Sequence, residues 1–145
     1  MALFMPSAVA GVPQYRTAKT STDSNQLTAV GEAITVTAAQ LTLGAVFGNI
    51  RVPKGAEIAF VQLDATDLDS GTTITLEIGD AADTDRLLTA NTIAQAGGAP
   101  VGPTIAKTGL GYRYTDETLV QVRVAAAPTG GANGTIKYVL HYVSQ

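Results

Sequence analysis

Several residue types are scarce in this chain of 145 residues, and each shortage removes a class of function. The chain has no cysteine, which excludes disulfides, thiolate catalysis and zinc–thiolate sites. The chain has one histidine, His141, whereas a metalloenzyme site of converging imidazoles needs several. Tryptophan is absent and aromatic residues make up only 6% of the chain, which weakens the case for an aromatic sugar-binding face.

Charge is scarce as well. Charged residues make up 14% of the chain, against about 25% in an average protein. Surface covered by partners would explain this shortage, and so would a neutral exterior rich in threonine. The pI of 4.9 and the scattered basic residues argue against binding to nucleic acid, which needs clustered Lys and Arg. No apolar run approaches the ~20 residues that span a bilayer, so we expect no membrane partner.

The first 26 residues differ from the rest of the chain. Pro6 and Pro13 prevent a helix, and residues 20–25 form a polar loop. The apolar residues before that loop suit either an extended arm lying on another subunit or an edge strand on the chain's own domain. An Ala-Val-Ala tripeptide at residues 8–10 mimics a signal-peptidase site, but no basic segment precedes it. We therefore expect the segment to be retained and the chain to be made in the cytoplasm.

From residue 27 onward, apolar and polar residues alternate with the period of two that is typical of β-strands. The clearest runs are residues 72–78, 119–125 and 135–143. About eight strands can be counted, with at most one short helix of one or two turns within residues 83–91. Strands with one apolar face need a second sheet to cover it, so the pattern predicts an all-β sandwich or barrel.

Acidic residues are concentrated in the middle of the chain. All eight acidic residues between Glu57 and Asp85 stand in a stretch without Lys or Arg. Two loops repeat the spacing Asp-x-x-Asp-x-Asp, with the aspartates Asp64, Asp67 and Asp69, then Asp80, Asp83 and Asp85. Oxygen-rich loops can bind Ca²⁺, but neither has the glycine and glutamate of a helix-loop-helix calcium loop. We expect turn and capping roles and no metal, with contact to a basic partner as the alternative.

No catalytic set stands out. Ser70 or Ser144 could be combined with His141 in a Ser–His–Asp arrangement, but the spacing indicates neither a nucleophile turn nor an oxyanion hole. A histidine that alternates with apolar residues on a strand is more simply a sheet-surface or interface residue. The glycine-rich segments 97–102 and 130–134 lack the strand–glycine–helix context of phosphate loops. We therefore expect neither an enzyme nor a cofactor.

The turns and strand spacing resemble a known family. Val-Pro-Lys-Gly-Ala at 52–56 precedes a strand, followed by Asp-Leu-Asp-Ser-Gly at 67–71, Ile-Gly-Asp at 78–80 and Asp-Thr-Asp-Arg-Leu-Leu at 83–88. The chain closes with the strands Leu-Val-Gln-Val-Arg-Val and Tyr-Val-Leu-His-Tyr. Over residues 30–143 this pattern resembles the capsid cement (decoration) proteins of tailed bacteriophages.

The resemblance implies a fold, a location and partners. The fold would be a jelly-roll-like antiparallel β-sandwich over residues 27–145, preceded by an extended N-terminal arm of residues 1–26. The protein would sit on the outer capsid surface of the virion and bridge neighbouring subunits of the major capsid protein. The resemblance also implies self-association. Lattice symmetry would place the protein on an axis as a closed dimer or trimer, and we favour the homotrimer. We expect the capsid contacts in the arm, at Leu3, Phe4, Val9, Tyr15 and Arg16.

Two other kinds of binding or structural protein stay open. A β-sandwich carbohydrate- or receptor-binding module of a virion would favour a concave aromatic face and an occupied calcium loop. The shell-forming jelly-roll subunit of a small virus usually carries a basic arm when it packages nucleic acid, and this arm offers only Arg16 and Lys19.

Overall fold

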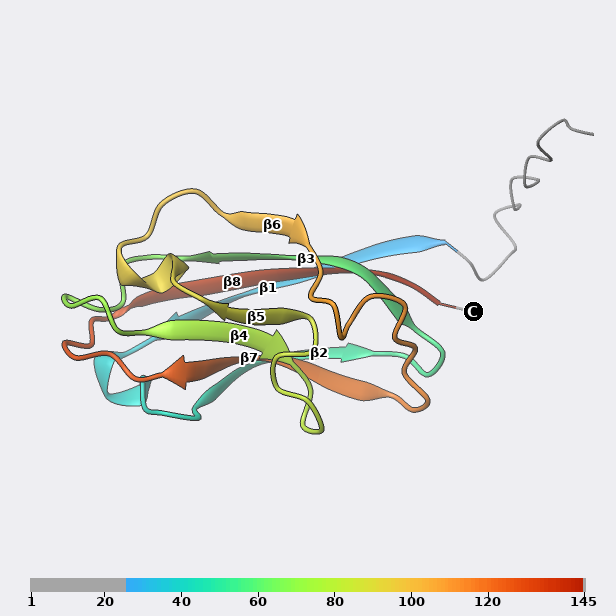
Figure 1. Ribbon diagram of the computed structural model, residues 1–145, viewed down its shortest axis with the longest axis horizontal. Helices are drawn as coiled ribbons and strands as arrows, with labels where there is room; N and C mark the ends of the chain where they lie inside the picture. The colour runs from blue at the N-terminus through green and yellow to red at the C-terminus, as the bar shows by residue number, and fades with distance from the viewer. Residues whose placement is uncertain (1–25, 145) are drawn as a thin grey trace, which may run out of the picture.

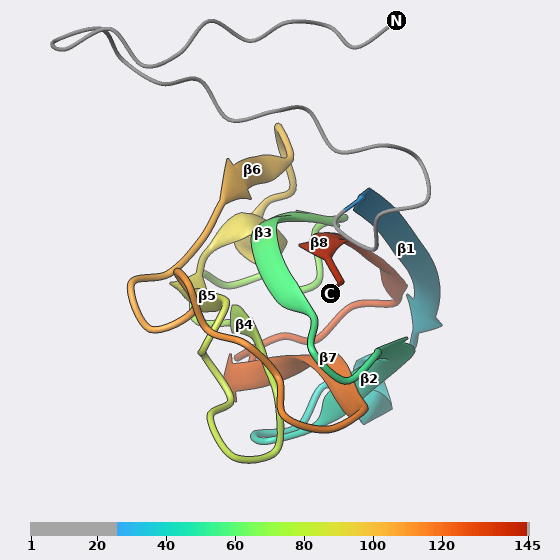
Figure 2. The ribbon, with the colours of Figure 1, turned by 90° about the vertical axis from the view of Figure 1, so that its right-hand side faces the viewer.

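The computed structural model describes residues 26–144, which form two four-stranded antiparallel sheets packed face to face (Figures 1 and 2). The first sheet contains, in order, β1 (Leu27–Val36), β8 (Gly134–Val143), β3 (Glu57–Ala65) and β6 (Val101–Thr104). The second sheet contains, in order, β2 (Val46–Val52), β7 (Thr118–Ala126), β4 (Thr75–Gly79) and β5 (Leu88–Asn91). The only helical pieces in this part of the chain are η1 (Ala38–Gln40) and η2 (Ile93–Gln95). Neither these nor any other described segment makes a helix that could cross a membrane.

The strand order is that of a jelly roll. β1 pairs with β8, β2 with β7, β3 with β6 and β4 with β5, so each strand in the first half of the fold meets its counterpart from the second half. All of these pairs are antiparallel. β1 lies beside β2 on one side of the sandwich (Figure 2), and η2 lies against both β3 and β4. The prediction of an all-β, jelly-roll-like sandwich of about eight strands is confirmed.

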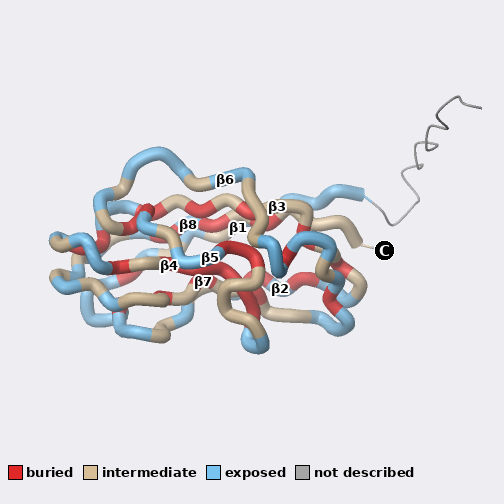
Figure 3. Tube along the Cα trace, in the orientation of Figure 1, coloured by how far each residue is buried: buried red, intermediate tan, exposed pale blue. Residues whose placement is uncertain are grey.

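The core lies between the two sheets, where buried residues are concentrated on the central strands (Figure 3) and alternate with less buried ones along β3, β7 and β8. Of the three inward rows that the sequence pattern predicts, two are fully buried: Ile74, Leu76 and Ile78, and Val120, Val122 and Val124. In the third row Ile136, Tyr138 and Leu140 are buried, and Tyr142 is half-buried. Each such aliphatic side chain stabilises the fold by about 1.5–3 kcal/mol when it leaves water. Period-two alternation located these rows but not the core residues outside the strands, such as Leu41, Leu68 and Tyr114.

A polar cluster closes the side of the sandwich where β1 lies beside β2. The hydroxyl of Tyr138 donates to the carbonyl of Val120 at 2.8 Å and accepts from the N–H of Ile50 at 3.4 Å. Burial raises the pKa of Tyr138 to about 12, so the hydroxyl stays neutral. The carboxylate of Glu32 accepts the N–H of Asn49 at 2.7 Å and thereby joins β1 to β2. The two sheets are therefore joined here by side chains rather than by a strand ladder.

The helical turns that we predicted within residues 83–91 are wrong. The chain instead makes a turn after β4 and enters β5, where Leu88 pairs with Ile78 and Asn91 with Leu76. Leu87 and Leu88 are both buried. Local capping signals favoured a helix, but pairing with the edge of β4 buries these leucines and satisfies the backbone at the same time.

Candidate functional site

The first acidic loop is organised around Asp69, which is fully buried. One carboxylate oxygen accepts the N–H groups of Gly71 and Gly130, both at 2.9 Å. The other accepts the N–H groups of Thr73 at 2.9 Å and Ile74 at 3.0 Å, and also the Thr73 hydroxyl at 3.0 Å. Gly130 belongs to the loop between β7 and β8, so this one side chain joins two loops that are far apart in sequence.

These hydrogen bonds also set the charge of Asp69. Burial by itself raises the pKa of this carboxyl, but the backbone N–H donors outweigh it. The net result is that the pKa lies well below its ordinary range and the side chain is ionised. Both oxygens are occupied by protein donors, so Asp69 acts as the capping residue that we expected at a turn.

The second acidic loop is organised around Asp80. Its carboxylate accepts two backbone N–H groups of the following turn at 2.9 and 3.0 Å, the Arg86 Nε–H at 2.6 Å and the Tyr114 hydroxyl at 3.1 Å. The guanidinium of Arg86 lies 3.7 Å from the centre of the Tyr112 ring. Burial raises the pKa of Asp80, but the hydrogen bond from Arg86, followed by those from the turn and Tyr114, lowers it below its usual value.

Two further aspartates lie beside this cluster. The pKa of Asp85 is raised, first by the hydrogen bond that it shares with Asp83, then by burial, and then by the negative charges of Asp83 and Glu77. Glu77 is itself paired with Arg123, at 2.6 Å between Oε1 and Nη1. Arg86 and Arg123, which follow the acidic stretch in sequence, therefore offset two of its eight negative charges.

The structure does not gather the six aspartates into one surface. The first loop precedes β4 and the second follows it, so the two groups lie at opposite ends of that strand (Figure 1). Asp69 and Asp80 are buried, Asp67 is exposed, and Asp64, Asp83 and Asp85 are half-buried. Within residues 26–144, no three acidic or histidine side chains lie close enough together to hold a metal ion.

His141 lies on the outer face of the first sheet. Its ring stacks on Phe60, with 4.2 Å between the ring centres. It pairs in register with Phe60, whereas Ser70 follows the far end of β3, beyond Ala65. Five residues of strand separate these two points, or about 16 Å, so Ser70 is out of reach of the imidazole. The arrangement matches the sheet-surface role that we expected for His141.

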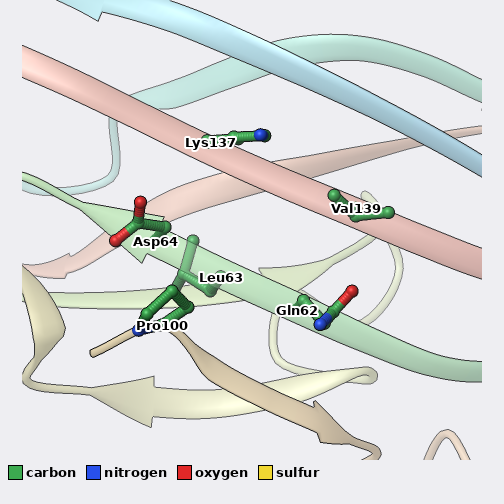
Figure 4. Close-up of a pocket in the computed structure, with 6 residues that line it drawn as sticks. All are labelled: Gln62, Leu63, Asp64, Pro100, Lys137 and Val139. Carbon is green, nitrogen blue, oxygen red and sulfur yellow. The ribbon is translucent and has the colours of Figure 1, made fainter.

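The outer face of the first sheet carries few charges. Its outward residues on β1, β8 and β3 are Leu27, Ala29, Gly31, Ala33, Thr35, Thr135, Lys137, Val139, His141, Val143, Glu57, Phe60, Gln62 and Asp64. An open hollow of about 160 Å³ lies on this face, beside Pro100 (Figure 4). Lys137 and Asp64 face each other in register, yet their charged ends extend in different directions and form no ion pair. Such a face suits contact with another protein.

The residues that we predicted to contact the capsid, in the segment 1–25, lie outside the described part of the chain. Sequence reasoning missed the residues around the two central aspartates. Arg86 and Tyr114 donate to Asp80, and Tyr112 stacks under Arg86. Thr73 and Gly130 donate to Asp69. The one available signal was the run Asp-Arg at 85–86, where a basic residue directly follows the acidic loop.

Comparison with known proteins points to phage capsids. No family model and no curated protein sequence matches the chain. A solved structure titled as the capsid of Ralstonia phage GP4 contains a chain that matches with a TM-score of 0.71 and 29% identity, over 90% of this chain and 92% of that one. The capsid asymmetric unit of cyanophage Pam1 contains a match with a TM-score of 0.63 and 28% identity, over 97% of this chain and 100% of that one.

A third match shares the fold alone. It comes from the acid-stable capsid of Helicobacter pylori bacteriophage KHP30, with a TM-score of 0.51 and 16% identity over 83% of this chain and 94% of that one. All three solved structures are therefore bacteriophage capsids.

Proposed function

We propose that this chain is a structural protein of a bacteriophage virion and that it acts there as a cement protein. The observation that carries the proposal is the similarity to two phage capsid chains over 92% and 100% of their own lengths. In those capsids the matched chain is thus itself a small β-sandwich rather than one domain of a much larger subunit. A small, separate capsid chain suits a role in reinforcing a shell.

The described surface supports binding rather than catalysis. Asp69 and Asp80 are occupied by hydrogen bonds inside the protein, and His141 stacks on an aromatic ring. The outer face of the first sheet is instead broad and poor in charge. These features support a role in protein–protein contact.

The proposed mechanism is stabilisation by mass action. The protein binds the outer surface of the expanded shell and bridges neighbouring subunits of the major capsid protein. Because it binds only the expanded lattice, each occupied site favours that state over dissociated or contracted ones. Many such sites on one particle add together. We assign the capsid contacts to the apolar arm and, among the acidic residues, to the accessible Asp64 and Asp67.

The test is binding to expanded capsids of the same phage that lack the protein. Added protein reaches only the outside of a closed shell, so saturable co-sedimentation also reports the outer surface. We expect saturation at a fixed ratio to the major capsid protein and a raised melting temperature of the shell. Absence of binding, together with a melting temperature of the free protein that shifts with Ca²⁺ or a sugar, would instead support the carbohydrate- or receptor-binding alternative.

The arm is tested separately. Replacement of Leu3, Phe4 and Val9 by serine should leave the melting temperature of the free protein unchanged and abolish co-sedimentation. The matched control replaces Leu43 and Leu110, which are 68% and 71% exposed on loops of the sandwich, by serine. Normal binding by the arm variant, or equal loss of binding in the control, would contradict the assignment.

A further inference from the structure

The four edge strands of the sandwich are not equally protected against pairing with another chain. Natural proteins guard sheet edges with short strands, bulges, proline or charge. β5 and β6 have only four residues each, and β6 contains Pro103. β2 carries a register shift between Phe47 and Ile50 and the exposed Arg51. These three edges are therefore poor templates for a further strand.

β1 has none of these guards. It is ten residues long, and its ladder with β8 runs through ten successive pairs without a register shift. It contains no proline, lysine or arginine, and its one charged residue is Glu32, whose carboxylate is bonded to the backbone N–H of Asn49. Within residues 26–144, no strand pairs with its outer edge.

Only the first half of β1 is accessible along that edge. From Glu32 onward the strand lies against β2, through the bond to Asn49. Figures 1 and 2 both show the first part of β1 standing apart from β2. In an antiparallel ladder every second residue of an edge strand points its N–H and C=O away from its neighbour. The residues from Leu27 to Gly31 thus present unpaired backbone groups and no charge.

We propose that two copies of this chain pair antiparallel along β1, from Leu27 to Gly31, around a two-fold axis at Ala29. The two first sheets then join into one continuous eight-stranded sheet. An antiparallel pair of identical strands is self-complementary, as an isologous interface requires. This inference goes beyond the proposed capsid role, and it concerns association in solution, so the two can fail separately.

Side-chain sizes support a second copy as the occupant. With the axis at Ala29, Leu27 of one copy lies opposite Gly31 of the other on the same face of the joined sheet. Leu27 is one of the exposed large apolar residues, at 53%. A Cβ at Gly31 would lie 3.0 Å from a methyl of Val139, so the glycine leaves that methyl uncovered. Leu27 of the second copy therefore covers both Gly31 and Val139.

The inner side of the strand matches as well. In the same register Thr28 lies opposite Val30 of the second copy, a pair of β-branched residues of the kind that stabilises adjacent strands. A contact of five residues per strand buries less than the ~1,200 Å² of a standard interface. We therefore expect a dimer with a micromolar dissociation constant in solution, in place of the homotrimer that we favoured from the resemblance. High local concentration on a capsid would favour this dimer.

The main test places charge at the axis. Ala29 is exposed, so Ala29→Lys and Ala29→Glu should fold normally, and each should raise the dimer dissociation constant at least about tenfold, because like charges oppose each other. A mixture of the two variants should recover association, because opposite charges then face each other. The control is Ala90→Lys, at an exposed position of the guarded edge strand β5, which should associate like the wild type. Sedimentation velocity over a concentration series measures the association of the wild type, the three variants and the mixture.

A second pair of variants tests the contact of Leu27. Leu27→Ser should weaken the dimer, and Leu110→Ser, at a position 71% exposed, should not. Three results would overturn the proposal: equal association of Ala29→Lys and Ala90→Lys, no recovery in the mixture, or a trimer that is insensitive to both Ala29 variants. The competing occupant of the edge is the chain's own arm. A full-length monomer that dimerises only after deletion of residues 1–15 would establish that occupant instead.

Discussion

The close approach of Gly48 to Tyr138 makes a quantitative test of the fold possible. Gly48 has a φ of +105°, in the region that L side chains rarely adopt. A Cβ built there would collide with the Tyr138 hydroxyl oxygen and lie 2.7 Å from its Cζ. The glycine lets β2 bulge over the ring while the hydroxyl reaches Val120 and Ile50. We predict that Gly48→Ala is strongly destabilising.

The expected cost has two parts. A left-handed backbone costs a non-glycine residue about 1–2 kcal/mol. Forcing an extra methyl group into a packed site costs about 1–3 kcal/mol more. The sum of about 2–5 kcal/mol is a large fraction of the ~5–15 kcal/mol that stabilises a typical domain. Gly111 supplies the matched control, because its φ is +75° but a Cβ there would meet nothing within 4 Å.

The assay is urea unfolding of Gly48→Ala and Gly111→Ala, followed by circular dichroism. The difference between the two variants isolates the contact with Tyr138, because both carry the backbone strain and both change the entropy of the unfolded chain in the same way. Tyr138→Phe in each background completes the test. In the Gly48→Ala background the loss of the hydroxyl should relieve part of the collision, so the double variant should be more stable than the sum of the single changes predicts.

Two results would refute this reasoning. If Gly48→Ala costs no more than Gly111→Ala, the ring has room for the methyl group and the close approach does not constrain β2. If the two changes at positions 48 and 138 are additive, the hydroxyl is not the group with which the methyl collides.

Two further predictions concern the acidic loops. The folded-state pKa values of Asp69 and Asp80 lie below their unfolded values, so their stabilising contribution is present above the unfolded pKa of about 3.9 and is lost as the pH falls below it. The urea midpoint should therefore fall steeply below about pH 4 and less steeply in Asp69→Asn; identical slopes for both proteins would contradict this. Arg86→Gln removes the closest donor to the buried Asp80 carboxylate and should cost about 1–3 kcal/mol in thermal unfolding. Arg86→Lys should recover little of this stability, because lysine lacks the planar group that lies over Tyr112. Full recovery would mean that the contact with Tyr112 does not contribute to stability.

Much of the candidate site depends on contacts that no single-sequence pattern could locate. Aspartate is an ordinary turn residue, so a capping role for Asp69 follows from sequence, but its bond to Gly130 joins residues 61 positions apart. Asp80 belongs to a loop with the same Asp-x-x-Asp-x-Asp spacing, yet the distant Tyr114 and the neighbouring Arg86 determine its charge and burial. The unguarded edge of β1 is likewise invisible until the order of strands is known. The capsid contacts assigned to the arm, including Tyr15 and Arg16, stay predictions.

The sequence by itself determined the all-β class and the inward rows of residues such as Ile74 and Val122, because side-chain direction in a strand follows from alternation between neighbours. It also excluded thiolate chemistry, because that chemistry needs cysteine and the chain has none. Only the tertiary structure decided that residues 88–91 form a strand instead of a helix, and that β1 lies beside β8 with an outer edge that no strand of residues 26–144 covers. These outcomes depend on which distant segments bury each other's apolar faces and complete each other's hydrogen bonds. Such pairings are a property of the whole chain, and local propensity yields to them.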